Sequence, residues 1–127
     1  MEKEVNVKPP GMALIDTATL AVLVRAKAPV VLLDARSEEH DNGERIPGAK
    51  NLPPNSSAYE VDKAVGSKKT LAITYCSNLQ RSASMKLFRH LKNLGYENVL
   101  QYSDGLAGWK AAGYPIQQES MRHDAVS

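Results

Sequence analysis

The fold is decided by the stretch Thr70-Leu71-Ala72-Ile73-Thr74-Tyr75-Cys76 and by the segment that follows it. A continuous apolar and β-branched run is typical of a strand buried on both faces of a parallel sheet. A polar loop comes next, and residues 82–94 then place their apolar side chains on one helical face. Gly95 stands where a left-handed C-terminal cap belongs. The stretch predicts a buried strand, a loop that begins at Cys76, and a helix over 82–94.

The rest of the chain repeats this alternation of strands and helices. Residues 30–33 and 98–102 predict two further strands, and residues 49–52 a weaker one. Further helices are expected from a cap at Thr17 or Thr19 to about Pro29, over residues 59–65 and over residues 105–112. Alternation of this kind predicts an α/β fold, with a small, mainly parallel sheet of about five strands and helices on both faces.

The length and composition are those of one folded domain. The chain has 127 residues, of which 43% are hydrophobic and 24% charged. We expect the domain over residues 12–116, between flexible segments at 1–11 and 117–127. Neither a signal peptide nor a membrane-spanning run is apparent, so a cytoplasmic location and no contact with membrane are expected.

Several classes of function fit the composition poorly. A net charge of +2 is too small to indicate a nucleic-acid partner. Cys76 is the only cysteine, which excludes an intramolecular disulfide and a metal site with several cysteines. His40, His90 and His123 are too scattered for metal-ligand spacing, and His90 is interpreted as a surface residue. Neither a metal nor a cofactor is therefore expected.

Cys76 is the strongest candidate for a catalytic residue. In α/β sheets, ligands bind outside the carboxyl ends of the strands, where this loop is expected. The free N–H groups at the start of the next helix attract anions and stabilise a thiolate. Arg81, at the far end of the loop, adds a guanidinium to this site. The pattern indicates a nucleophilic cysteine beside an anion site, and the alternative is a small, inert cysteine at a strand end.

Four stretches resemble the signature sequences of the single-domain rhodaneses, a sulfurtransferase superfamily. They are VLLDAR at 31–36, RIPGAKNLP at 45–53, CSNLQRS at 76–82, and GLAGW with GYP between 105 and 115. The resemblance covers about residues 14–116. The chain differs from the family pattern in having Leu79 at a usual glycine, Arg45 at a usual histidine and Asp104 at the first of two usual glycines.

The resemblance implies that sulfane sulfur is transferred through a Cys76 persulfide. The thiolate would take sulfur from a donor such as thiosulfate and pass it to cyanide, to a thiol or to a sulfur-accepting protein. The implied binding residues for the anionic donor and the persulfide are Arg81, Ser77, Asn78, Leu79, Gln80 and Ser82. Asp34 and Arg36 either line the mouth of the pocket or form a buried ion pair behind the loop, and Trp109 is expected in the core.

Two other interpretations compete with a sulfurtransferase enzyme. The first is a non-enzymatic module, either a persulfide carrier that relays sulfur to a partner protein or a scaffold with an idle loop. The presence of both Cys76 and Arg81 argues against an idle loop, whereas a carrier would need these residues as an enzyme does. The second is a phosphatase of the related dual-specificity type, in which arginine follows the cysteine by six positions. That position holds Ser82 here, and Arg81 is one residue closer. The shorter loop predicts a smaller pocket, suited to sulfur rather than to a phosphate group.

Overall fold

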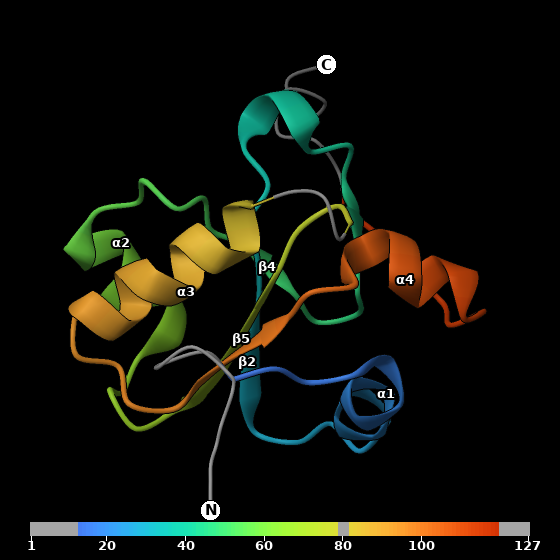
Figure 1. Cartoon of the computed structure of the whole chain (residues 1–127), viewed down its shortest axis with the longest axis horizontal. Coiled ribbons are helices and arrows are strands. Elements are labelled where there is room, and N and C mark those ends of the chain that lie inside the picture. The colour runs from blue at the N-terminus through green and yellow to red at the C-terminus, as the bar shows by residue number, and fades with distance from the viewer. Residues whose placement is uncertain (1–12, 79–81, 120–127) are drawn as a thin grey trace, which may run out of the picture.

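The computed structural model of the chain describes residues 13–78 and 82–119. Its centre is a parallel sheet of four strands in the order β4-β2-β5-β6. The strands are β2 (Val30–Asp34), β4 (Lys50–Asn51), β5 (Leu71–Tyr75) and β6 (Val99–Tyr102). Helices cover both faces of the sheet (Figure 1), which confirms the predicted α/β fold.

Each face of the sheet carries two helices and its own apolar cluster. The helices are α1 (Thr17–Arg25) and α4 (Gly105–Ala111) on one face, and α2 (Ala58–Val65) and α3 (Ala83–Asn93) on the other (Figure 1). Ile73 packs in the cluster under α1 and α4, whereas its neighbour Ala72 packs under α2 and α3. Because side chains alternate across a strand, a strand buried on both faces needs apolar residues toward both clusters.

The number of strands differs from the sequence prediction of about five. Beside β6, at the edge of the sheet, Leu14 forms only an isolated parallel bridge with Gln101. A second, antiparallel sheet joins β3 (Glu44–Arg45) to β7 (Gln117–Gln118). β7 lies beyond the predicted domain boundary at residue 116 and pairs with β3 inside the domain, so the fold continues past that boundary. The predicted flexible segment at 1–11, and residues 120–127 of the one predicted at 117–127, lie outside the described residues.

The helix ends show why the chain turns where it does. Asp16, rather than Thr17 or Thr19, caps α1, because its carboxylate accepts a hydrogen bond of 2.8 Å from the Thr19 backbone N–H. Gly95 ends α3 with a φ of +97°, as predicted. None of the helices in residues 13–78 and 82–119 is long and apolar enough to cross a membrane.

The register of the sheet brings three strand ends to one edge. Asp34 lies opposite Tyr75, and Tyr75 lies opposite Tyr102. The segments that follow β2, β5 and β6 therefore start side by side at the carboxyl edge, where parallel sheets bind ligands. A short 3-10 helix, η1 (Glu38–His40), follows β2 at this edge.

Candidate active site

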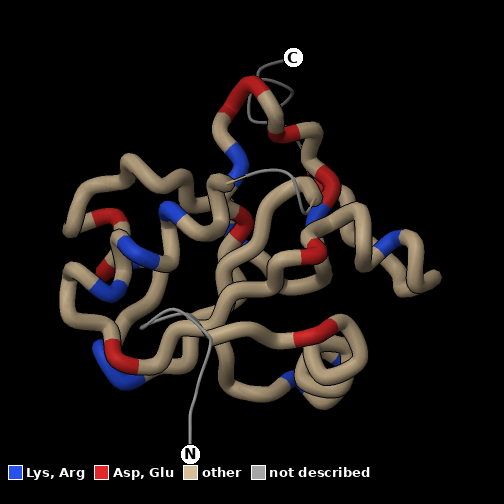
Figure 2. Tube along the Cα trace, in the orientation of Figure 1, with Lys and Arg blue, Asp and Glu red and all other residues tan. Residues whose placement is uncertain are grey.

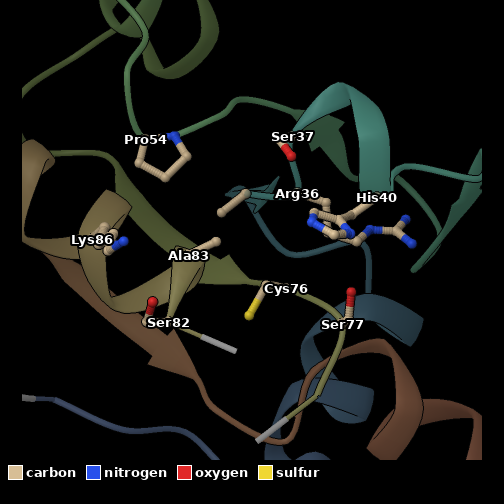
Figure 3. A pocket seen from close by; sticks show the side chains of 10 residues that line it. Arg36, Ser37, His40, Pro54, Cys76, Ser77, Ser82, Ala83 and Lys86 are labelled. Carbon is tan, nitrogen blue, oxygen red and sulfur yellow. The ribbon is translucent and has the colours of Figure 1, made fainter. Parts of the chain in front are cut away.

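Cys76 lies at the floor of a pocket at the carboxyl edge of the sheet. It directly follows β5, and only 1% of its surface is exposed. The pocket has a volume of about 240 Å³, room for about eight water molecules. Its walls come from the end of β2, η1, the Cys76 loop and the first turns of α3 (Figure 3). The predicted placement of Cys76 between a buried strand and a helix is confirmed.

The predicted loop residues divide into three groups. Ser77 and Ser82 line the pocket with Cys76. Asn78 instead places its backbone carbonyl 3.8 Å from Cys76 Sγ. The remaining three, Leu79, Gln80 and Arg81, lie outside the described residues.

The start of α4 holds the Cys76 loop through backbone contacts. The N–H groups of Leu106 and Ala107 donate hydrogen bonds of 2.8 Å to the carbonyls of Cys76 and Ser77, respectively. Gly105, with a φ of +69°, permits this approach, because a Cβ there would lie 2.5 Å from the Cys76 carbonyl oxygen. In a trans peptide group the N–H and the C=O point in opposite directions. The contacts with α4 therefore fix the direction of the loop's first peptide groups, with the N–H of the following residue facing away from α4.

A buried cluster of neutral side chains lies on the other side of the cysteine. Ser84 Oγ, on α3, is 3.6 Å from Cys76 Sγ and accepts a hydrogen bond of 2.9 Å from Gln101 Nε2. Thr74 Oγ1 donates a bond of 3.0 Å to the Ser84 carbonyl. All three polar residues are at most 5% exposed. This neutral cluster (Thr74, Ser84 and Gln101) connects the sheet, the helix and Cys76 Sγ.

A buried charged cluster lies behind η1. Arg36 Nε donates to both carboxylate oxygens of Asp34, at 3.0 and 3.1 Å, and Nη2 lies 2.7 Å from Oδ2. Asp34 is fully buried and does not line the pocket, whereas Arg36 does line it. The two alternatives for this pair are thus combined, with Arg36 at the pocket wall and its charge neutralised by Asp34. Burial opposes the charge on Arg36, but the bonds from Asp34 outweigh it and raise the pKa of Arg36.

Arg45, one of the departures from the family pattern, pairs with Asp41 in this charged cluster. Arg45 Nη1 and Nη2 bind the carboxylate of Asp41 at 2.6 and 2.9 Å, and Nη1 also lies 3.3 Å from Asp34. Arg45 is 2% exposed. The hydrogen bond from Arg45 lowers the pKa of Asp41. The charged cluster (Asp34, Arg36, Asp41 and Arg45) is internally compensated, so it leaves little net charge for a ligand.

Lys86 is the pocket cation that this cluster does not neutralise. It lies one turn after Ser82 on α3, is exposed, and forms no ion pair with any described residue. Long helical side chains lean toward the helix N-terminus, which here is the side of the pocket. The described wall of the pocket contains no carboxylate, and basic positions follow α3 while acidic ones gather on η1 (Figure 2). The arrangement favours a small anion beside Cys76.

Sequence reasoning missed several of these residues. Lys86 and His40 both line the pocket, and neither is a site candidate on the sequence alone. Ser84 could have been noticed, since it stands three and four residues before Leu87 and Phe88 on the apolar stripe of α3. His90 is not a simple surface residue, because it is half-buried and its Nε2 lies 2.7 Å from the Ser56 carbonyl.

Trp109 is buried in the core, as expected, and its Nε1 donates to the Pro115 carbonyl at 2.7 Å. Within residues 13–78 and 82–119, no three His, Cys, Asp or Glu residues are grouped so that they could hold a metal ion.

Comparison with known proteins identifies a relative in sequence. A curated relative, the HTH-type transcriptional regulator Rv0324 of Mycobacterium tuberculosis, is 30% identical over 105 residues. The matched region covers 81% of this chain but 45% of the regulator, so the chain spans less than half the length of that protein.

Solved structures share the fold at low identity. The BH2092 protein of Bacillus halodurans has a TM-score of 0.75 at 20% identity, covering 91% of this chain and 90% of that one. A thiosulfate sulfurtransferase of Pseudomonas aeruginosa has a TM-score of 0.75 at 24% identity, over 87% of this chain and 21% of that one. The rhodanese-like domain of the Anabaena sp. Alr3790 protein has a TM-score of 0.68 at 23% identity, over 88% and 80%.

The family model for the rhodanese-like domain matches residues 17–112. This range includes the four-stranded sheet, the Cys76 loop and α4. Family membership supports a role in sulfur transfer or sulfur relay. On the strength of this match and the shared fold, the chain belongs to the rhodanese-like family.

Proposed function

We propose that the protein is a sulfurtransferase that carries sulfane sulfur on Cys76, from an anionic donor such as thiosulfate to a thiol or cyanide. The observation that carries the proposal is the position of Cys76 at the floor of a small pocket whose described wall holds Lys86 and no carboxylate. A thiolate nucleophile must be positioned toward its target, and a small anion binds best beside a cation that no carboxylate neutralises.

The reaction consists of two displacements at sulfur. The Cys76 thiolate attacks the outer sulfur of thiosulfate, a new S–S bond forms, and the bond to the sulfonate sulfur breaks. Sulfite leaves with that electron pair, and Cys76 holds the outer sulfur as a persulfide. An acceptor then attacks the outer sulfur. Cyanide becomes thiocyanate, or a thiolate becomes a persulfide, and the Cys76 thiolate is restored with the electron pair of the broken S–S bond.

Binding of the donor is proposed to depend on the open side of the pocket. Lys86 attracts the oxyanion, and the Ser77 and Ser82 hydroxyls, which line the same pocket, donate hydrogen bonds to it. Arg81 is proposed to add its guanidinium, with the loop residues Asn78, Leu79 and Gln80 around the sulfur. Arg36 contributes shape more than charge, because Asp34 already binds its guanidinium.

The direct test is transfer of sulfur from thiosulfate to cyanide, followed as thiocyanate. Wild-type protein is expected to turn over, and Cys76→Ser is expected to be inactive with an unchanged circular dichroism spectrum. Arg89→Gln is the matched control, because this exposed cation of α3 does not line the pocket. Activity of Cys76→Ser near the wild-type rate would overturn the proposal.

A persulfide carrier is the second candidate, and the curated relative favours it. That relative is named a transcriptional regulator, and this chain matches 45% of its length. A carrier would load sulfur on Cys76 but release it slowly to free cyanide and rapidly to its own protein partner. Burst loading without steady turnover would separate the carrier from the enzyme. We expect either role in the cytoplasm, where thiols stay reduced.

A further inference from the structure

Ser84 is a buried polar residue on the apolar face of α3. It is 1% exposed and stands on the same face as Leu87, Phe88 and Leu91. Side chains from two neighbouring strands bind Ser84, because Thr74 on β5 and Gln101 on β6 lie opposite each other in the sheet. Thr74 binds the carbonyl of Ser84, and Gln101 binds its hydroxyl.

Among the described residues, the proton of the Ser84 hydroxyl has one possible acceptor. An amide nitrogen can only donate, so Gln101 Nε2 occupies a lone pair of Ser84 Oγ. The other side-chain contact of Ser84 Oγ is with Cys76 Sγ, at 3.6 Å. A neutral thiol can donate its S–H to Ser84 Oγ. When Cys76 is a thiolate it has no proton to donate, and the hydroxyl must supply the proton of this contact.

From this geometry we infer that Ser84, held by Gln101, is a catalytic residue that donates a hydrogen bond to the Cys76 thiolate. The proton stays on Ser84 throughout, and the proton of the thiol leaves to solvent before the attack. The inference rests on the proposed function, because it concerns the same sulfur. Gln101 is a positioning residue, which favours the hydroxyl proton toward Sγ by occupying a lone pair of the oxygen.

The contact acts in both displacements. It stabilises the thiolate that attacks the donor and the same thiolate when it leaves from the persulfide. Between these events Sγ is bonded to the outer sulfur and carries less charge, so the hydrogen bond from Ser84 is strongest when Cys76 is the thiolate. Hydrogen bonds to a charged group are stronger than those between neutral groups. A buried site increases the difference further.

The test compares variants of the neutral cluster by the rate at which iodoacetamide alkylates Cys76 at one neutral pH. Ser84→Ala is expected to react about ten- to a hundredfold more slowly, the loss of one hydrogen bond to a charged group. Ser84→Thr restores the hydroxyl and is expected to return most of the rate. Gln101→Leu keeps the hydroxyl but frees its orientation, so a smaller loss of about three- to tenfold is expected.

Thr74→Val is the matched control. It removes an equally buried hydrogen bond to Ser84, but one that reaches the backbone carbonyl and not the hydroxyl. Its alkylation rate is expected to stay near that of the wild type, even if it lowers the melting temperature. Equal losses in Thr74→Val and Ser84→Ala, or a wild-type rate in Ser84→Ala, would overturn the inference. If Ser84→Ala does not fold, the ratio of Gln101→Leu to Thr74→Val decides.

The same measurement separates this inference from the proposed function. Alkylation requires a reactive thiolate but no sulfur donor. If Ser84→Ala slows alkylation and the wild type transfers no sulfur, then the role of Ser84 stands and the sulfurtransferase proposal fails. If the wild type transfers sulfur and Ser84→Ala alkylates and transfers normally, then the enzyme stands and the role of Ser84 fails.

Discussion

Two buried polar clusters flank Cys76, and they differ in charge. The charged cluster behind η1 binds its four members to one another, with the carboxylates of Asp34 and Asp41 each shared by Arg36 and Arg45. The neutral cluster under α3 ends at the sulfur itself, through Ser84. We infer a division of roles from this difference: the charged cluster holds the wall of the pocket in shape, whereas the Ser84 hydroxyl, bound by Gln101, acts on the nucleophile.

The largest expected effect comes from breaking the charged cluster. Asp34→Asn leaves two buried guanidinium groups with less compensation, so a loss of about 3–5 kcal/mol in the free energy of unfolding is expected. Lys110→Met is the control, because Lys110 forms an exposed ion pair of 2.8 Å with Glu44, and about 0–1 kcal/mol is expected there. Urea denaturation measures both. Similar losses in the two variants would mean that the charged cluster has no special structural role.

Gly105→Ala tests the backbone support of the loop that lies between the two clusters. The new Cβ would meet the Cys76 carbonyl at 2.5 Å, so the loop or α4 must shift. A shift of the nucleophile by about 1 Å costs up to about a hundredfold in rate. Gly113→Ala is matched to it, because Gly113 has a similar φ of +88° but nothing within 4 Å of the Cβ position.

Both glycine variants are expected to lose stability through backbone strain, about 1–2 kcal/mol each. Only Gly105→Ala is expected to lose sulfur transfer well beyond that. The initial rate of thiocyanate formation at saturating thiosulfate is the measurement, with melting temperatures recorded alongside. A full rate in Gly105→Ala would show that the contact with α4 does not position Cys76.

Lys86→Gln tests whether Lys86, rather than the charged cluster, attracts the anionic substrate. The carboxylates of the charged cluster compensate its arginines, whereas Lys86 forms no ion pair with a described residue. Removing the Lys86 charge should therefore raise the KM for thiosulfate roughly three- to tenfold, because solvent screens an exposed cation and limits the effect. Turnover at saturation should change little, because Lys86 is not expected to touch the sulfur. The Arg89→Gln control, on the outer surface of the same helix, should keep the wild-type KM. An equal rise in the KM of both variants would mean that Lys86 acts only through the general charge of the surface.

The smallest effect concerns the response of the charged cluster to acid. The hydrogen bond from Arg45 lowers the pKa of Asp41 below its ordinary value of 3.8. Such a carboxyl stabilises the folded chain fully above its unfolded pKa, and this contribution is lost as the pH falls through the lower, folded pKa. Asp41→Asn should therefore be less stable than the wild type at neutral pH, and the difference should shrink below about pH 4. Denaturation midpoints across this range are the check, and a constant difference would contradict the role of Asp41.

The sequence predicted well those parts of the fold that depend on local patterns. The continuous apolar run over β5 and the apolar stripe of α3 each specify an element, and Gly95 ends the helix because its left-handed φ suits glycine. Cys76 could be placed between them for the same reason. Parallel strands then bring the site to a predictable edge.

The partners of Cys76 could not be predicted in the same way. Gln101 reaches Ser84 across 17 positions of sequence, and only the register of β5 with β6 brings Gln101 opposite Thr74. The place of Lys86 at the pocket could not be predicted either, because periodicity describes the faces of a helix but not the loops near its first turn. The pairing of Arg45 with Asp41 likewise depends on the path of the chain after η1.

The intact mass of the protein after incubation with thiosulfate shows whether Cys76 takes up sulfane sulfur. We expect the wild-type protein to gain one sulfur atom per chain, a reductant to remove it, and Cys76→Ser to gain none. Because Cys76 is the only cysteine, the location of the gain is unambiguous. No gain in the wild type, or an equal gain in Cys76→Ser, would contradict the account.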